Sequence, residues 1–340
     1  AEELAVTNSR LDGLEAKFNN YEAGAFSETT TASFSADMAI GAVDGVAGAE
    51  AVMALYGFQI DLNTSFTGED SLDISIDAGN GSAGLSELDL NGTSDDLTVD
   101  GVAYTFPIGE KTTVFVGDNM DGSTLYSTAC VYGGITNTLD DCGNANSAMA
   151  GGQGTAAGAS FDIGNGFTAA VGYTGAGSST KGLLTKEGAD VFGGQLTYTA
   201  DSYGASVTYS NEETADTSGK YLDGRDVTYW GLNAYWTPSE SGSMPSISAG
   251  YEMGDPELAN AKDTTHYFLG LQWDEVGPGT FGAALGTTGH TAENETEYLM
   301  YEAFYSYGLN DGMTITPVVY VKEQAGDDQT GIMVKTSFSF

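Results

Sequence analysis

The feature that most constrains this chain is a two-residue alternation of apolar and polar side chains, which begins near Phe26 and continues to the C-terminus. In the segment YGASVTYS, one face carries Tyr203, Ala205, Val207 and Tyr209, and the other carries small or polar residues. The final segment, GIMVKTSFSF, alternates in the same way. Because successive side chains of a β-strand point to opposite faces, each segment predicts a strand with one apolar and one wet face.

Sixteen segments of this kind can be counted, and the connections between them fall into two classes. The segments lie near 26–40, 51–66, 71–79, 97–107, 111–118, 155–163, 166–174, 190–200, 203–211, 225–237, 245–254, 263–274, 279–288, 296–308, 312–322 and 330–340. Connections after the even-numbered segments are mostly tight turns such as IGNGF and LNDGM. Connections after the odd-numbered segments are longer and carry many acids. This pattern predicts an all-β, 16-stranded antiparallel transmembrane β-barrel.

The net charge of the chain limits the classes of molecule that it can bind. Asp and Glu number 48 against 10 Lys and Arg, which gives a net charge of -38. Charge this high is typical of disorder, but 19 Tyr and 15 Phe argue for a folded chain. Such a polyanion is a poor partner for nucleic acid and attracts cations. No apolar run approaches the roughly 20 residues of a transmembrane helix, although alternating barrel strands escape that test.

Residues 1–24 have a different, helical periodicity. Leu4, Leu11 and Phe18 fall seven residues apart, and a second series of apolar residues is offset by three. This spacing predicts a short N-terminal helical or coiled-coil spacer, either packed on the main domain or self-associating. The sequence therefore divides into a spacer, 1–24, and a β-barrel domain, 25–340.

The longest connection, about 119–154, contains the only two cysteines of the chain, Cys130 and Cys142. A disulfide between them would close a small loop, which the chain-entropy argument values at about 3 kcal/mol. It would stiffen a segment that we expect to be unable to order itself by hydrophobic burial. An oxidising compartment makes this bond plausible, and two free buried thiols are the alternative.

The same connection holds oxygen ligands of the kind that calcium prefers, at Asp118, Asn119, Asp121, Asp140 and Asp141. Their spacing, D-x-x-D-G, does not match the calcium loop of EF-hands. We therefore expect no dedicated cofactor, and at most a weak association of calcium or magnesium with Asp118 and Asp121.

Motifs of enzymes are missing from the sequence, which has no HExxH, P-loop, CxxC or GxSxG pattern. His266 and His290 have no obvious Ser or Cys partner. The sequence predicts no catalytic residues and a protein that is not an enzyme, with a hydrolytic barrel as the alternative.

Several runs resemble a known family. FPIGEKTTVFVGDNMDGSTLYSTACVYGG, followed by DDCGN and GASFDIGNGFTAAVGY, is similar to the outer-membrane porins of cyanobacteria. RLDGLEAKF and FSETTTASFSADMAI resemble the spacer and first strand of those porins. The resemblance covers essentially the whole chain and is strongest around 106–173. This family belongs with the carbohydrate-selective porins, although its cyanobacterial members are associated mainly with small inorganic ions.

The resemblance implies a 16-stranded barrel in the outer membrane of a Gram-negative-type envelope, assembled as a homotrimer and surrounded by lipid. It also implies that the third long loop, here about 119–154, folds inward and narrows the pore. This sequence departs from known porins in two ways. It does not contain the surface-layer-homology domain that usually precedes the spacer in cyanobacterial porins. Its only arginines, Arg10 and Arg225, cannot form the arginine cluster that faces the acidic loop in enterobacterial-type porins.

The predicted site follows from the loop and from strand parity. We expect Asp118, Asp121, Asp140 and Asp141 at or near the narrowest zone. Parity predicts that the lumen is lined by Asp37, Asp61, Asp73, Asp77, Asp162, Glu252, Glu302, Lys322 and Lys335. Because rings of carboxylates favour cations, these residues predict a cation-preferring porin for passive diffusion of small hydrophilic solutes and ions. For each carboxylate, a solvated charge without a pore role is the alternative.

Two other functions stay open at this point. One is a substrate-specific channel for a carbohydrate or a nutrient ion. The other is a soluble, secreted, β-rich surface protein or adhesin, which would purify without detergent.

Overall fold

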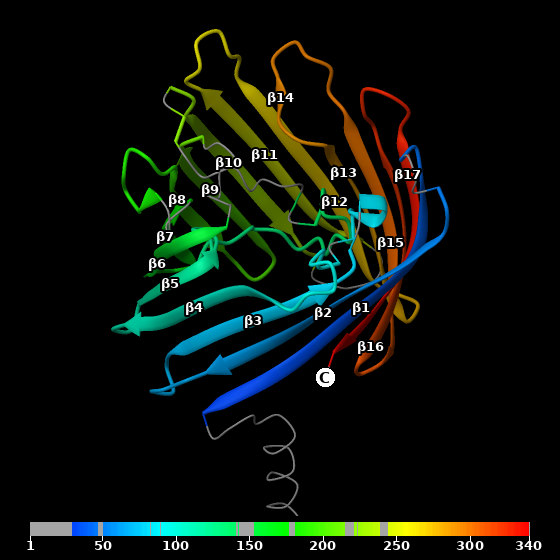
Figure 1. Ribbon diagram of the computed structural model, residues 1–340, viewed down its shortest axis with the longest axis horizontal. Helices are drawn as coiled ribbons and strands as arrows, with labels where there is room; N and C mark the ends of the chain where they lie inside the picture. Colours follow the sequence, from blue (N-terminus) through cyan, green and yellow to red (C-terminus); the bar gives the residue numbers. More distant parts are fainter. Residues whose placement is uncertain are drawn as a thin grey trace, which may run out of the picture.

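The computed structural model describes residues 29–46, 50–81, 83–88, 90–140, 142, 153–176, 181–214, 221–222, 224–238 and 244–339. Its strands form one closed, antiparallel β-barrel (Figure 1). The barrel closes because β1 (Thr30–Asp44) pairs with β2 (Met53–Thr64) on one side and with β17 (Gln329–Ser339) on the other. The predicted spacer, 1–24, lies outside the described residues.

The sheet contains 17 strands, one of which, β14, is a two-residue strand in a loop. The remaining strands are β3 (Ser71–Gly79), β4 (Thr98–Ile108), β5 (Thr112–Met120), β6 (Gly154–Gly164), β7 (Phe167–Gly175), β8 (Asp190–Thr199), β9 (Tyr203–Glu212), β10 (Val227–Trp236), β11 (Ser246–Pro256), β12 (Thr264–Val276), β13 (Gly279–Thr287), β14 (Thr291–Ala292), β15 (Leu299–Asn310) and β16 (Met313–Lys322). Sixteen strands therefore make the wall, which confirms the predicted fold class.

The alternation in the sequence separates an inner from an outer face. In β11, Ser248 and Glu252 point inward and are buried, whereas Ile247, Tyr251 and Met253 point outward and are exposed. Neighbouring strands keep this register, since Tyr251 pairs with Tyr267 and Glu252 pairs with His266. The outer face is thus apolar, and the inner face is rich in small and polar residues.

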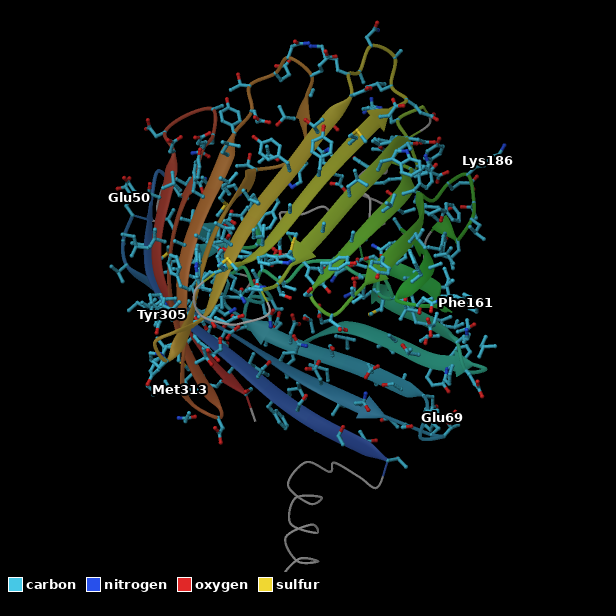
Figure 2. All side chains as sticks on the ribbon, turned by 180° about the vertical axis from the view of Figure 1, so that it is seen from behind. Glu50, Glu69, Phe161, Lys186, Tyr305 and Met313 are labelled. Atoms are coloured by element: carbon cyan, nitrogen blue, oxygen red, sulfur yellow. A yellow bond between two sulfur atoms is a disulfide. The ribbon has the colours of Figure 1, made fainter. Side chains whose placement is uncertain are left out.

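The strands are joined by short turns at one end of the barrel and by longer loops at the other, as the sequence predicts. Figure 2 shows Glu69 and Met313, beside short turns, toward one end, and Glu50 and Lys186, in longer loops, toward the other. At a typical short turn, Asn165 has a φ of 54°, a left-handed conformation that Asn tolerates. Among the described residues, no helix is long and apolar enough to cross a membrane.

Two loops fold into the barrel instead of projecting from it. We call the described residues within 80–97, between β3 and β4, the second loop, and the described residues within 121–153, between β5 and β6, the third loop. The second loop contains a short 3-10 helix, η1 (Ala83–Leu85). In Figure 1 the cyan and green segments that follow β3 and β5 run within the ring of strands. The inward third loop therefore agrees with the prediction, and the inward second loop was not predicted.

The two loops and the wall enclose an apolar cluster inside the barrel, which we call the internal cluster. The loops contribute Leu85, Leu88, Leu90, Tyr132, Leu139 and Cys142, and the wall contributes Ala39, Val43, Phe268, Ala284, Met300, Phe304, Val318, Tyr320 and Met333. The position of Phe268 on the inner face of β12 places it in this cluster. Trp230 and Trp236, in contrast, lie on the outer face of β10 and are exposed.

Candidate functional site

The third loop crosses the interior on hydrogen bonds to the barrel wall. Its first contact is Gly122 N–H, which donates to Thr174 Oγ1 of β7 at 2.6 Å. Next, Ser127 N–H donates to Gln195 Oε1 of β8 at 2.7 Å, and Gln195 Nε2 donates back to the Ser127 carbonyl at 2.8 Å. The loop thus begins by following the inner face of neighbouring strands, using neutral side chains as partners.

Further along, the same loop reaches the opposite side of the barrel. Val131 N–H donates to Ser248 Oγ of β11 at 3.0 Å, and Gly133 N–H donates to Gln272 Oε1 of β12 at 2.9 Å. Such bonds satisfy backbone groups that would otherwise be buried without partners. They hold the loop across the lumen rather than in solvent.

Glu302 of β15 is the strongest polar anchor of the third loop. Its carboxylate accepts hydrogen bonds from Tyr132 Oη at 2.7 Å, from Thr136 N–H at 2.7 Å and from Ile135 N–H at 3.3 Å. Burial, and then the carboxylate of Glu302, raises the pKa of Tyr132 well above its usual range, so this phenol stays a donor. Hydrogen bonds to a charged acceptor are stronger than those between neutral groups, so this contact fixes the centre of the loop.

Glycines on the inner face let the loop approach the wall closely. A Cβ at Gly270 would lie 2.7 Å from the Tyr132 ring, and one at Gly286 would lie 3.0 Å from Leu139 Cδ2. Any larger residue at these positions would push the loop off the wall. The glycines are therefore part of the reason that this loop can lie inside the barrel.

The predicted disulfide between Cys130 and Cys142 is present, with a Cα–Cα distance of 6.0 Å. The expectation that the segment cannot order itself by hydrophobic burial is wrong. Tyr132, Leu139 and Cys142 are buried in the internal cluster, so apolar packing holds the loop together with the disulfide.

Between the third loop and the wall of β1, β2 and β17 lies a polar cavity of about 290 Å³. Its lining comes from both loops and from the wall, with Ser35, Asp37, Gly57, Phe58, Gln59, Asn91, Gly134, Ile135, Asp140 and Lys335. Lys335 Nζ forms an ion pair with Asp37 Oδ2 at 3.0 Å across this lining. The cavity is the candidate site for solute passage.

On the wall beside this cavity, a row of carboxylates is held by neutral donors. Asp61 Oδ1 accepts from Gln59 Nε2 and from Ser75 Oγ, both at 2.7 Å. Asp73 accepts from Asn63 Nδ2 at 2.5 Å and from Ser71 Oγ at 2.8 Å. Asp77, farther along β3, accepts from Thr98 Oγ1. Amides and hydroxyls orient these carboxylates without neutralising their charge.

All of the residues predicted to face the lumen lie on the inner face by strand alternation. Asp37, Asp61, Asp73 and Asp162 are partly or fully exposed there. Asp77, however, is buried, at 8% exposure. Glu252 and Glu302 are buried as well, at 0% and 4%. These two carboxylates therefore do not line a water-filled path, because a histidine covers the first and the third loop covers the second.

The predicted constriction residues are not brought together. Asp140 lines the cavity, Asp121 lies at the start of the third loop, and Asp141 is outside the described residues. Asp118 alternates with Val116 on the outer face of β5, and its carboxylate accepts a hydrogen bond from Thr155 Oγ1 at 2.6 Å. This register moves Asp118 from the expected pore lining to the outer side of the wall.

The described residues contain no group of three or more His, Cys, Asp or Glu side chains arranged to hold a metal ion. Weak association of calcium or magnesium with Asp118 and Asp121 stays a prediction, and the outward position of Asp118 gives it little support.

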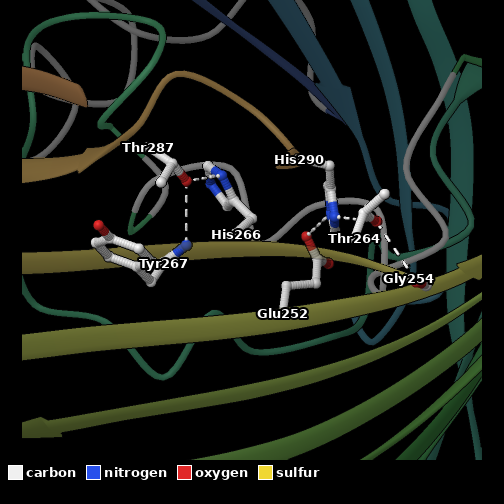
Figure 3. A network of polar contacts seen from close by, with 7 residues as sticks. All are labelled: Glu252, Gly254, Thr264, His266, Tyr267, Thr287 and His290. Atoms are coloured by element: carbon white, nitrogen blue, oxygen red, sulfur yellow. Dashed lines mark hydrogen bonds and ion pairs between the residues drawn. The ribbon is translucent and has the colours of Figure 1, made fainter. Parts of the chain in front are cut away.

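The two histidines form a polar network on the inner face, which the sequence did not indicate (Figure 3). His290 Nε2 lies 2.8 Å from Glu252 Oε2, and His266 Nδ1 lies 2.6 Å from Thr287 Oγ1. The two rings stack with centroids 5.6 Å apart. His290 Nδ1 also lies 3.0 Å from Thr264 Oγ1 of β12, so the network ties the loop after β13 to β11 and β12.

The second loop was the main omission of the sequence-based interpretation. Glu87 Oε2 accepts from Thr138 Oγ1 at 2.9 Å, and Glu87 Oε1 pairs with Lys322 Nζ at 2.5 Å. Leu85, Leu88 and Leu90 on either side of Glu87 are buried. Three leucines within the run LSELDL are unusual for a solvent-exposed loop, and they were the available signal.

Comparisons with known proteins give the fold. No protein-family model matches the chain, and no curated protein matches it in sequence. Among solved structures, OprB of Pseudomonas putida is similar with a TM-score of 0.66 and 13% identity, over 92% of this chain and 94% of OprB. An anion-selective porin from Comamonas acidovorans has a TM-score of 0.62 at 13% identity, over 92% of this chain and 99% of that porin. A Vibrio cholerae OmpT variant lacking its loop L8 has a TM-score of 0.62 at 10% identity, with the same coverage. This chain therefore has the fold of the bacterial outer-membrane porins.

Proposed function

We propose that the protein is an outer-membrane channel of a Gram-negative-type envelope, through which small hydrophilic solutes and inorganic ions diffuse passively, with a preference for cations. A closed barrel with an apolar outer face and a polar cavity inside supports this function. The porin fold of the similar structures supports it as well. On this proposal the protein is a channel rather than an enzyme.

The observation that carries the cation preference is the row of carboxylates on β2 and β3. Asp61 and Asp73 are partly exposed and are held by amides and hydroxyls, and none of the ion pairs found among the described residues involves them. Carboxylates that keep their charge along a narrow aqueous path raise the local concentration of cations.

The inner lysines do not offset this charge. Lys335 pairs with Asp37, and Lys322 pairs with Glu87, so each lysine neutralises a carboxylate of its own. The fold does not decide the sign of the preference, because the similar porin from Comamonas acidovorans is described as anion-selective. The preference must therefore come from the residues that line this particular pore.

Reversal potentials in planar bilayers under a salt gradient test the preference directly. We expect the wild-type channel to favour cations, and the double change Asp61→Asn with Asp73→Asn to lower that preference by removing two fixed charges. Asp118→Asn is the matched control, because it removes the same charge from the outer face. The salt dependence should be strong, since screening shortens the reach of these charges.

An anion preference in the wild type would refute the proposal. Equal shifts for the double variant and for Asp118→Asn would show that the row on β2 and β3 does not set selectivity. A channel specific for a carbohydrate or a nutrient ion would instead show a current that this solute blocks at low concentration. A soluble surface protein would purify without detergent and give no current.

We further propose a homotrimer in contact with membrane lipid. The outer face of β1 and β17 supports an apolar neighbour, since Met38, Ile40 and Ile332 are exposed there. Chemical cross-linking in detergent and heat-modifiable mobility in SDS gels are expected for a trimer. A single band at the monomer mass, before and after heating, would contradict it.

A further inference from the structure

Glu87 of the second loop forms several hydrogen bonds with the third loop. Its side chain is buried, and its two carboxylate oxygens have different partners. Oε2 accepts from Thr138 N–H at 3.2 Å and from Thr138 Oγ1 at 2.9 Å, whereas Oε1 pairs with Lys322 Nζ at 2.5 Å. The backbone carbonyl of Glu87 also accepts from Asn137 N–H at 2.9 Å.

These contacts join separate parts of the molecule. Glu87 belongs to the second loop, Asn137 and Thr138 belong to the third loop, and Lys322 is on β16 of the wall. Lys322 Nζ completes the connection by donating to Thr138 Oγ1 at 3.1 Å. One residue therefore ties both loops to each other and to the barrel.

The position of this connection matters for the cavity. Asn137 and Thr138 lie between Ile135 and Asp140, which line the cavity from the third loop, and Asn91 of the second loop lines it too. A shift of residues 137–138 must therefore move the lining. The side chain of Glu87 itself is not among the lining residues, so it acts on the passage through the two loops that it joins.

The second loop is fixed firmly enough to act as a support. Leu85, Leu88 and Leu90 are buried in the internal cluster beside Leu139 of the third loop. The backbone at Leu90 lies so close to the wall that a Cβ at Gly79 of β3 would lie 2.9 Å from the Leu90 carbonyl oxygen, and one at Gly57 of β2 would lie 3.1 Å from the Leu90 carbonyl carbon. A rigid support is what a positioning residue needs, because a mobile partner would not fix the third loop.

We propose that Glu87 is a positioning residue for the passage, and that the second loop is a structural part of the constriction. This inference rests on the proposed channel function. Removing Lys322 alone would leave the Glu87 carboxylate buried without its cation, which is more harmful than removing the pair.

The test compares Glu87→Ala, Glu87→Gln, Lys322→Met and the double variant Glu87→Gln with Lys322→Met in the full-length protein. Glu50→Ala is the matched control, because it removes an exposed glutamate from another loop. Hydrogen exchange in detergent measures how well the amides of the third loop are protected. Single-channel current in planar bilayers measures the conductance of the passage. Glu87→Gln keeps an oxygen for Thr138 and serves as the milder variant if Glu87→Ala does not fold.

We expect the amides of Asn137 and Thr138 to exchange at least about tenfold faster in Glu87→Ala, as the loss of hydrogen bonds to a charged group implies. The single-channel current should change in the same variant. Lys322→Met should change the exchange rates and the single-channel current more than the double variant does. If the variants acted only by a general loss of stability, the double variant would instead show the larger change.

Exchange rates equal to those of Glu50→Ala would overturn the inference. Faster exchange with an unchanged current would overturn it as well, because the connection would then not position the passage. A wild-type protein that gives no current, while the exchange of Glu87→Ala is faster, would refute the proposed channel function and leave the loop connection standing.

Discussion

The second and third loops both fold into the barrel, but apolar burial and hydrogen bonding contribute to them in different proportions. The second loop returns along the wall of β2 and β3, where three buried leucines and a few hydrogen bonds, such as that from Asn91 Nδ2 to the Phe58 carbonyl at 3.1 Å, hold it. The third loop spans residues 121–153 and crosses the lumen on hydrogen bonds to β7, β8, β11, β12 and β15, with one disulfide.

The difference shows how loop length and anchoring are related in this interior. Apolar burial needs little directional geometry, so a short loop can be fixed by a few side chains in one cluster. A long loop has many backbone groups to satisfy, and it must find donors and acceptors along its whole path. The three changes below separate these two kinds of anchoring.

The largest effect is expected for Leu88→Ala in the second loop. Leu88 is 0% exposed, and truncating a buried leucine costs about 2–5 kcal/mol. Limited digestion of the detergent-solubilised protein with a protease that cleaves after acidic residues should cut the second loop much faster. Leu97→Ala is the matched control, since Leu97 ends the same loop but is 66% exposed. Equal digestion of the two variants would mean that leucine burial does not hold this loop.

A smaller effect, confined to the third loop, is expected for Glu302→Gln. The glutamine can still accept a hydrogen bond from Thr136 N–H, but a bond to a charged group contributes about 1.5–3 kcal/mol and a bond between neutral groups only about 0.5–1.5 kcal/mol. The amides of Ile135 and Thr136 should exchange faster with solvent, and the second loop should keep its resistance to protease. Glu295→Gln, at an exposed glutamate, is the control. Faster exchange in the third loop together with faster digestion of the second loop would show that the two loops are anchored as one unit.

The smallest effect on the position of the folded third loop is expected for the double change Cys130→Ala with Cys142→Ala. Chain entropy values this disulfide at about 3 kcal/mol against the unfolded state, but the folded loop keeps its hydrogen bonds and the burial of Tyr132 and Leu139. Denaturant unfolding should shift to lower concentration, while exchange at Thr136 changes less than in Glu302→Gln. Full release of the third loop by this change would give the disulfide the main anchoring role.

Much of the wall could be predicted from the sequence, and much of the interior could not. The strand at 71–79 was predicted to the residue, and the alternation in β11 placed Glu252 on the inner face. The same alternation could not reveal that Glu252 is buried, because its cover is His290, which is distant in sequence. Asp118 was expected at the constriction because it lies beside the third loop, whereas the register of β5 turns this side chain outward.

The sequence by itself determined the closed barrel, because a two-residue period and alternating connection lengths are local properties that each strand carries alone. It also determined that a disulfide could form, since only Cys130 and Cys142 are available. Only the tertiary structure decided what fills the barrel. The inward second loop, the anchor at Glu302 and the connection at Glu87 join residues that are far apart in the chain, and packing inside a closed wall brings them together.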